Sequence, residues 1–401
     1  MTLRTEKQQT LSPAPPSLFL INPDRTAVEL ERILITELRY FGDVLLTTPL
    51  IGFLRKKYPN ARIDALVYHS TREMLTGNPD LDNVYTIDQK WKKMGVKKQL
   101  SAEINLLKTL KANHYDTLLH LTTHNRGMWL ARILKPKRSI SCPKHFGGLN
   151  FYNKSFTHMA SLVLPRERHI AQFNMDHLRA LGVVVPEEEV PGLKLTIPDE
   201  ARAEAAKLVG GLKDYVLVHP AARFFFKCWT EERTAEMLDR LASQGEKIVI
   251  TSGPSDEERT MIEKIVSLLK VAKPIVLIGK TPSMKTFAAL IDDAKLLIGV
   301  DSAPAHMAAA LQTPEVILFG ATIPGRWRPW ENNASRVVIS PGRCHFCEQR
   351  GCGRCGISEC MREIRVEDVM EAANELLEHR DIPDAYRKTV YGPNDRFPTY
   401  S

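Results

Sequence analysis

No long apolar run occurs in this sequence of 401 residues. Val316–Phe319 is typical of its apolar segments, whereas a membrane-spanning helix needs roughly 18 consecutive apolar residues. Within the first 25 residues the only apolar piece is Leu18–Ile21, well short of the roughly 7–15 residues at the centre of a secretory signal. The sequence therefore predicts neither an integral membrane protein nor an exported one.

Common nucleotide-binding signatures are missing as well. The sequence has no P-loop (GxxxxGKS or GxxxxGKT), and its only GxGxxG, Gly351–Gly356, lies among clustered cysteines with no predicted strand before it. The only Asp-x-Asp, Asp80–Asp82, falls in the N-terminal half and is interpreted as a surface turn. Basic side chains would then hold any nucleotide phosphate without a metal ion.

The overall composition is that of a globular protein, with 43% hydrophobic and 25% charged residues. A net charge of +8 suggests an anionic partner, which could be nucleic acid, phospholipid or a phosphorylated substrate. A solvated basic surface is the alternative. A zinc-containing nucleic-acid binder is disfavoured, because the basic residues are mostly scattered rather than clustered with aromatics on one face.

Predicted strands and helices alternate twice along the chain, which indicates two α/β halves with mostly parallel sheets. A Pro/Ser-rich leader comes first, and the polar stretch Pro186–Gly192 marks the boundary between the halves. We predict two Rossmann-like, doubly wound domains that face a central cleft. The predicted limits are 1–28 for the flexible leader, 29–186 and 187–380 for the two domains, and 381–401 for a tail. The predicted strands cover 32–38, 62–68, 117–121, 215–219, 247–251, 274–278, 295–299 and 316–319, and the predicted helices cover 44–57 and 104–111, a segment from 230, and 257–269.

Two strand–turn–helix segments carry candidate chemistry. In Tyr40–Pro49, Asp43 lies where the first strand gives way to a helix, and its carboxylate could act as a general base or simply cap that helix. In Val300–His306, backbone N–H groups at the helix start favour phosphate, and Asp301 and Ser302 add groups that bind hydroxyls. His306 lies one turn further on, facing either a ligand or the core.

A third segment, His219–Trp229, follows the first strand of the second half. Arg223 and Lys227 within it could pair with a diphosphate, or be ordinary solvated charges. The turn Gly253–Glu257 follows the next strand, and its carboxylates could hold a ribose, although a surface turn would look similar.

Taken together and in order, these segments resemble glycosyltransferase family 9, the lipopolysaccharide heptosyltransferases, over about residues 31–380. The specific pieces are Gly42–Pro49, Thr251–Gly253, Asp301–His306 and Phe319–Thr322. The resemblance implies a GT-B fold and an inverting, metal-independent transfer of heptose from ADP-L-glycero-β-D-manno-heptose to the inner core of lipid A. It is strongest to the heptosyltransferase III branch, which implies a branch heptose added to an existing one. Another GT-B transferase with a different nucleotide sugar is the alternative.

The resemblance also assigns roles. Asp43 becomes the catalytic base, and the remaining matches form the donor site, with Asp256 or Glu257 as the ribose-binding acid. Two departures affect that site: Ala303 stands where many members have glycine, and Ala221–Arg223 replaces paired threonines, so that Arg223 takes over phosphate contacts. The donor-binding set is Arg223, Lys227, Ser252, Gly253, Asp256, Glu257, Asp301, Ser302, Ala303 and His306.

The implied partners are the ADP-heptose donor and a lipid A–core acceptor, with no nucleic acid. The implied location is cytoplasmic, peripheral on the inner face of the inner membrane. Lys90–Lys98, which combines basic residues with Trp91 and Met94, is predicted to contact the anionic membrane surface, with a solvated loop as the alternative.

Five of the seven cysteines lie within Cys344–Cys360. No cofactor is required by the implied reaction, but two CxxC pairs have a spacing compatible with a structural zinc ion. The link between the pairs is much shorter than in common zinc fingers, so a tight loop of reduced thiols stays open as the alternative. The candidate ligands are Cys344, Cys347, Cys352 and Cys355.

Overall fold

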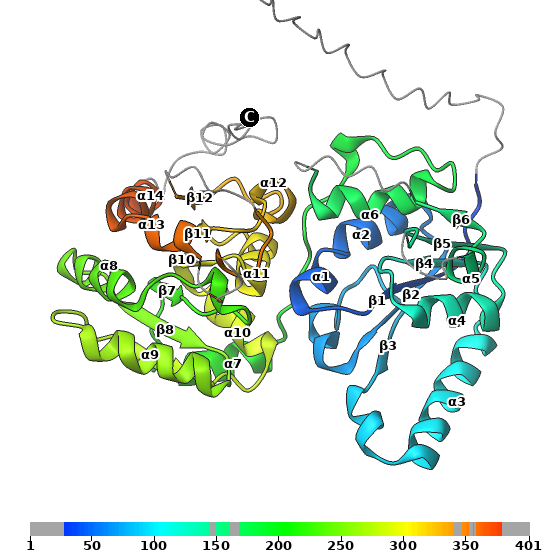
Figure 1. The fold of residues 1–401 in the computed structure, drawn as a ribbon, viewed down its shortest axis with the longest axis horizontal. Helices are drawn as coiled ribbons and strands as arrows, with labels where there is room; N and C mark the ends of the chain where they lie inside the picture. The colour runs from blue at the N-terminus through cyan, green and yellow to red at the C-terminus, as the bar shows by residue number, and fades with distance from the viewer. Residues whose placement is uncertain are drawn as a thin grey trace, which may run out of the picture.

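The computed structural model describes residues 28–144, 150–160, 168–340, 347–352, 356 and 358–378. It contains two six-stranded parallel sheets, one in each half of the chain (Figure 1). Nearly all of the predicted leader and the whole predicted tail lie outside the described residues. Among the described helices, none is both long enough and apolar enough to cross a membrane.

The N-terminal sheet has the strand order β3-β2-β1-β4-β5-β6. Helices α1, α2 and α6 cover one face, and α3 and α4 cover the other. The strands are β1 (Arg32–Glu37), β2 (Arg62–Tyr68), β3 (Asn83–Ile87), β4 (Thr117–His120), β5 (Arg138–Ser141) and β6 (His158–Met159). The helices are α1 (Phe41–Leu45), α2 (Thr48–Lys57), α3 (Val96–Ala112), α4 (Asn125–Leu134), α5 (Asn150–Asn153) and α6 (Ile170–Arg179), with the short 3₁₀ helices η1 (His69–Met74), η2 (Gln89–Lys93) and η3 (Glu187–Glu189).

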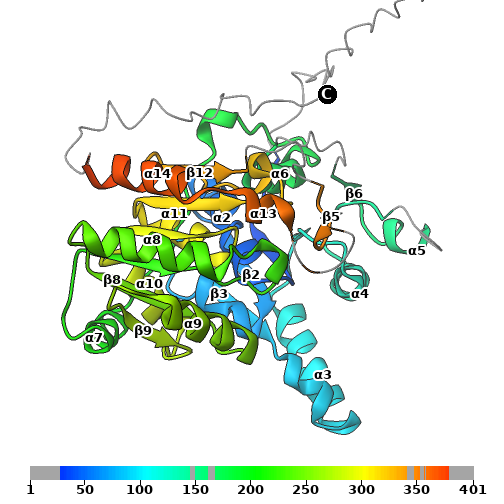
Figure 2. The same cartoon turned by 60° about the vertical axis from the view of Figure 1, so that its left-hand side comes forward.

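The C-terminal sheet, β12-β11-β10-β7-β8-β9, repeats the same winding. Helices α8, α9 and α14 cover one face (Figure 2), while α10 and α11 cover the other. The strands are β7 (Tyr215–His219), β8 (Ile248–Ser252), β9 (Ile275–Ile278), β10 (Ala294–Val300), β11 (Glu315–Phe319) and β12 (Ser335–Ile339). The helices are α7 (Asp199–Leu208), η4 (Phe225–Lys227), α8 (Glu231–Ser243), α9 (Asp256–Leu268), α10 (Met284–Asp292), α11 (Ala303–Leu311), α12 (Pro324–Trp327), α13 (Glu359–Glu363) and α14 (Val366–Glu378).

The predicted strands are confirmed, but the single helix predicted over 44–57 is wrong. The chain forms α1 and α2 with a break at Leu46 and Thr47. Pro49 has no N–H to donate to the Leu45 carbonyl, and the Thr48 hydroxyl donates to that carbonyl instead, at 2.8 Å. The break ends α1 at Leu45, two residues after Asp43, and separates it from α2.

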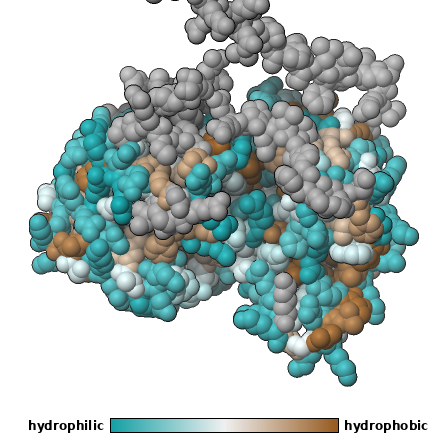
Figure 3. Space-filling model, in the orientation of Figure 1, coloured by the Kyte–Doolittle hydropathy of each residue, from teal (hydrophilic) through white to brown (hydrophobic). Residues whose placement is uncertain are grey.

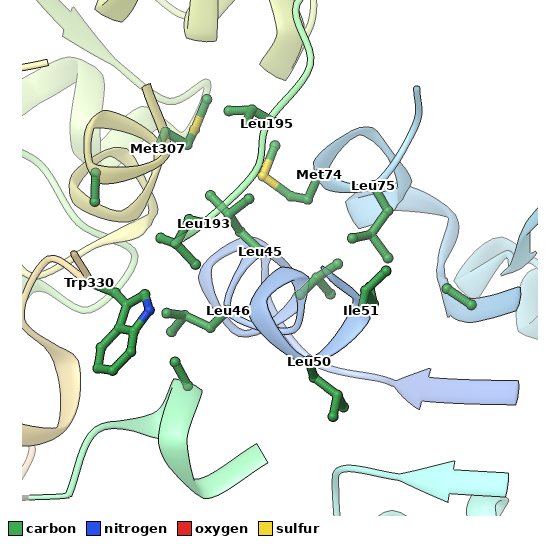
Figure 4. Close-up of a cluster of buried hydrophobic side chains, with 14 of the residues drawn as sticks. Leu45, Leu46, Leu50, Ile51, Met74, Leu75, Leu193, Leu195, Met307 and Trp330 are labelled. Carbon is green, nitrogen blue, oxygen red and sulfur yellow. The ribbon is translucent and has the colours of Figure 1, made fainter. Parts of the chain in front are cut away.

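One buried hydrophobic cluster extends from the N-terminal domain into the C-terminal domain (Figure 4). Leu46 of the α1–α2 break lies in it together with Leu193 of the connecting segment. Met307 of α11 and Trp330 join from the second domain, and the Trp330 indole N–H donates to the Pro191 carbonyl at 2.9 Å. The two domains therefore share apolar packing beneath the site.

Candidate functional site

Asp43 lies in the first turn of α1, at the carboxyl end of β1. The Tyr40 N–H lies 3.3 Å from its Oδ2, and Arg39 Nε lies 3.3 Å from Oδ1, so the carboxylate does hold the helix start as a cap would. Its side chain is only 13% exposed. Burial raises the pKa of Asp43, and the nearby charges of Arg39 and Lys227 oppose the rise. A carboxylate with increased proton affinity is suited to general-base chemistry.

Gly42 allows the two domains to meet closely at this point. A Cβ built on Gly42 would lie 2.8 Å from His306 Cδ2 and 3.9 Å from the Ala303 Cα. Because such a contact is shorter than carbon atoms tolerate, only glycine lets α1 lie directly against the start of α11. This contact brings Asp43 of the first domain beside the predicted donor turn of the second.

Lys227 and Asp301 form an ion pair in that second domain. Lys227 Nζ lies 2.6 Å from Asp301 Oδ2, which also accepts a hydrogen bond from the Thr322 hydroxyl at 2.6 Å. Both charged side chains are mostly buried, at 20% and 6% exposed. The Lys227 ammonium group therefore lies at the end of β10, where α11 begins. Its positive charge also opposes the rise in the pKa of Asp43.

The start of α11 carries a hydroxyl group and backbone N–H groups. The Ser302 hydroxyl donates to the Val300 carbonyl at 3.1 Å and does not cap the helix, and no other described side chain bonds to its first N–H groups. Ala303 begins the helix without a positive φ, so its Cβ causes no strain and glycine is not needed here. Uncapped N–H groups at the amino end of a nine-residue helix can bind an anion.

His306 is buried against Gly42, and its Nδ1 has no hydrogen-bond partner among the described residues. Burial lowers its pKa to about 4, so the ring is neutral near pH 7. His306 packs at the domain junction, within the first turns of α11, and its role in donor binding remains a prediction. An unpartnered ring nitrogen there leaves one polar atom that a ligand could satisfy.

Arg223 lies across the junction from the first domain. Its Cζ is 4.3 Å from the centre of the Tyr40 ring, and Tyr40 meets Phe224 edge-on with ring centres 6.3 Å apart. The guanidinium is exposed and makes a cation–π contact with Tyr40, and it forms no ion pair with a carboxylate of the described residues. Its five N–H donors remain suited to phosphate.

The predicted ribose-binding acids lie in the first turn of α9, just after β8. Asp256 and Glu257 are exposed in the first turn of α9, whereas Glu258 bends back and accepts the Gly253 N–H beside buried Ser252. The role of Asp256 or Glu257 in ribose binding remains a prediction, and Glu258 is a further carboxylate beside Gly253. Ser255 followed three residues later by Glu258 is a capping-box pattern, and that pattern could have identified the inward carboxylate.

Glu37 is a site residue that sequence reasoning missed. It ends β1 with its side chain buried, and within the part of the chain that the structure describes its Oε1 has no hydrogen-bond partner. Burial raises the pKa of Glu37 well above its ordinary value, and the Asp43 charge adds to the rise, so a carboxyl group with increased proton affinity lies near Asp43. A glutamate within the apolar run from Ile33 to Leu38 was the available signal.

The cysteine cluster is only partly described. Cys344 and Cys355 lie outside the described residues; Cys347 is exposed, and the Cys352 sulfur accepts the Glu359 N–H at 3.4 Å. Among the described residues no three His, Cys, Asp or Glu side chains converge as metal ligands. Because two of the four candidate ligands are outside that set, the zinc prediction remains a prediction.

A hollow on the outer face between α8, α9 and α14 contains none of the predicted site residues.

Two Rossmann-like domains with parallel six-stranded sheets, in contact where Gly42 meets the start of α11, have the GT-B arrangement. The sequence profile of glycosyltransferase family 9 (heptosyltransferase) matches residues 104–354. Lipopolysaccharide heptosyltransferase 3 of Escherichia coli K12 is 35% identical over 361 residues, covering 87% of this chain and 99% of that protein. The chain therefore belongs to glycosyltransferase family 9.

Solved structures agree with this assignment. A family 9 glycosyltransferase from Veillonella parvula superposes with a TM-score of 0.74 at 26% identity, over 88% of this chain and 99% of its own. ADP-heptose lipopolysaccharide heptosyltransferase II of E. coli gives a TM-score of 0.69 at 18% identity, over 88% of this chain and 100% of its own. The second similarity concerns the fold alone.

Proposed function

We propose that this enzyme is an inverting, metal-independent ADP-heptose:lipopolysaccharide heptosyltransferase that adds a branch heptose to an existing heptose of the inner core. The identity to E. coli lipopolysaccharide heptosyltransferase 3 over nearly its whole length supports the substrate class. A structure of E. coli heptosyltransferase WaaC with ADP-2-deoxy-2-fluoro heptose shares the fold. The observation that carries the proposal is the position of Asp43 beside Lys227 and the start of α11.

Asp43 is the group proposed to remove the acceptor proton. As the acceptor hydroxyl attacks the anomeric carbon of the donor, its proton passes to the Asp43 carboxylate, and a new glycosidic bond replaces the bond to ADP. One carboxylate suffices for a single displacement with inversion. The burial that raises the pKa of Asp43 strengthens it as a base.

The departing ADP gains negative charge, which the second domain is built to stabilise. Lys227, Arg223 and the uncapped N–H groups of α11 supply positive potential at that point. Lys227 would exchange part of its contact with Asp301 for a phosphate oxygen, while the Thr322 hydroxyl keeps its hydrogen bond to Asp301. These cationic groups support transfer without a divalent ion.

The decisive experiment is to incubate the protein with ADP-heptose and truncated core acceptors, and to weigh the products. Addition of one heptose mass, retained in EDTA, is expected, and NMR of the product gives the anomeric configuration and the linked position. Transfer from a UDP-sugar but not from ADP-heptose would favour another GT-B activity. Product that retains the donor configuration would overturn the inverting mechanism.

We also propose that the enzyme works in the cytoplasm, peripherally on the inner face of the inner membrane. The support is chemical: the acceptor of the E. coli relatives is named as a lipopolysaccharide, which carries a lipid, and this chain has net charge +8. Cell fractionation with low- and high-salt washes tests this location, because a peripheral protein is released from membranes by salt.

A further inference from the structure

Helix α3 carries a row of exposed apolar side chains. Val96 is 83% exposed, Leu100 57% and Ile104 40%, and Met94 just before the helix is 51% exposed. Figures 1 and 2 show α3 projecting from the N-terminal domain, and Figure 3 shows hydrophobic surface gathered over it. These four residues are called the α3 face below.

The α3 face is separate from the side on which α3 packs. Leu106, Leu107 and Leu110 join the domain core, and they lie in the second half of the helix. Val96, Leu100 and Ile104 are four residues apart, so they align along one side of the first half. Trp91, within the predicted contact segment Lys90–Lys98, packs partly buried against the same core and is not part of the α3 face.

Positive charge surrounds the α3 face. Lys93, Lys97, Lys98 and Lys108 are exposed, and none forms an ion pair with another described residue. The one acid within α3, Glu103, is neutralised by Arg126, whose two guanidinium nitrogens lie 2.5 and 2.8 Å from its carboxylate oxygens. The segment therefore combines exposed apolar groups with uncompensated cations.

We propose that the α3 face docks onto a lipid bilayer with anionic headgroups, the apolar row entering the interface and the lysines meeting the headgroups. Amphipathic helices with this combination lie in the plane of membranes. A second copy of this chain is disfavoured as occupant, since pairing two α3 faces would bring two sets of lysines together. Nucleic acid would leave the apolar row without a partner.

The position of α3 suits a lipid-anchored acceptor. Because α3 leads directly into β4, its last turn lies near the amino ends of the strands and its first turn lies toward their carboxyl ends. Asp43 follows β1 at those carboxyl ends. This part of the inference rests on the proposed function, whereas docking itself does not.

Vesicle binding tests the inference directly. The full chain is sedimented with vesicles of phosphatidylethanolamine and phosphatidylglycerol, and with neutral phosphatidylcholine vesicles. The apolar variant is Val96→Gln with Leu100→Gln and Ile104→Gln, which keeps good helix formers, and the charge variant is Lys97→Glu with Lys98→Glu. The matched control changes exposed residues of the other domain: Lys270→Glu, Val271→Gln and Lys273→Glu.

We expect wild type and control to bind anionic vesicles in a salt-sensitive way, and each α3 variant to bind at least about tenfold more weakly. Circular dichroism checks that the variants fold, and transfer to a soluble, delipidated core acceptor should be unchanged in them. Equal binding by the apolar variant, equal binding to neutral vesicles, or no binding by wild type would overturn the proposal. A wild-type dimer that the apolar variant abolishes would identify a second copy as the occupant. If the wild type itself transfers no heptose to the soluble acceptor, the proposed function, and not the docking proposal, would be contradicted.

Discussion

Lys227 Nζ lies 2.6 Å from Asp301 Oδ2, in an ion pair that is mostly buried. Removing one partner of a buried pair leaves the other uncompensated, so the choice of substitution decides what is measured. Lys227→Gln keeps a hydrogen-bond donor for Asp301 while removing the charge. Lys227 is therefore expected to contribute both to the stability of the donor turn, through Asp301, and to binding of the donor phosphates.

We expect Lys227→Gln to weaken ADP binding and to lower kcat/KM, because ground state and departing ADP share the lysine charge. A charge-assisted hydrogen bond is worth about 1.5–3 kcal/mol, which corresponds to roughly 10–150-fold in affinity. Calorimetry with ADP measures the loss, and exposed Lys273→Gln serves as the control. Unchanged affinity and rate would leave Lys227 with a structural role only.

Asp43→Asn is expected to lower kcat by roughly 10²–10⁴-fold, because the amide keeps the shape but cannot accept the proton. The melting temperature should change little, since the amide oxygen can still accept the Tyr40 N–H. In the wild type the base form of Asp43 is lost as pH falls through its raised pKa, so kcat should fall on acidification. Near-normal turnover by Asp43→Asn would reduce the carboxylate to a helix cap.

Gly42→Ala should damage both stability and activity. Its Cβ would lie 2.8 Å from His306 Cδ2, so α1 and α11 must move apart, at a cost of about 1–3 kcal/mol. Thermal melting and steady-state kinetics measure the two effects. His306→Ala should restore part of the stability when combined with Gly42→Ala, and a double variant no better than Gly42→Ala would show that this contact is not the cause.

Glu37→Gln is expected to raise the melting temperature by about 2 °C or more at pH 8. The pKa of Glu37 is higher in the folded protein than in the unfolded chain, so folding takes up a proton, and this costs more as pH rises above the unfolded value of about 4.5. The advantage of the variant should therefore grow from pH 4.5 upward and disappear below it. Exposed Glu188→Gln is the control, and a pH-independent difference between Glu37→Gln and wild type would contradict a raised pKa of Glu37 in the folded protein.

Much of the architecture could be predicted from the sequence. The predicted limits of β2 and β7 agree with the structure, because apolar residues bounded by polar turns mark buried parallel strands. The α1–α2 break was missed although Pro49 signalled it, since helical spacing continues across the break. Local patterns thus located the elements better than their ends.

Candidate site residues could be predicted from the sequence only where they lie in a single strand–turn–helix segment. Asp43 and Asp301 each follow a strand, so their sequence position already placed them at a sheet edge. The approach of Gly42 to His306 depends on how two domains dock, and no local pattern contains that information. The same is true of Arg223 on the Tyr40 ring.

Trp330 has one further consequence. Its indole stacks on His169 of the first domain at 4.6 Å and lies in the hydrophobic cluster that both domains share. Separating the halves would leave part of this cluster open to water on each fragment, which favours aggregation. The two halves are therefore not independent modules. If a whole domain were exchanged with that of a relative to change the donor or the acceptor, the residues around Trp330 from both domains would have to be transferred together.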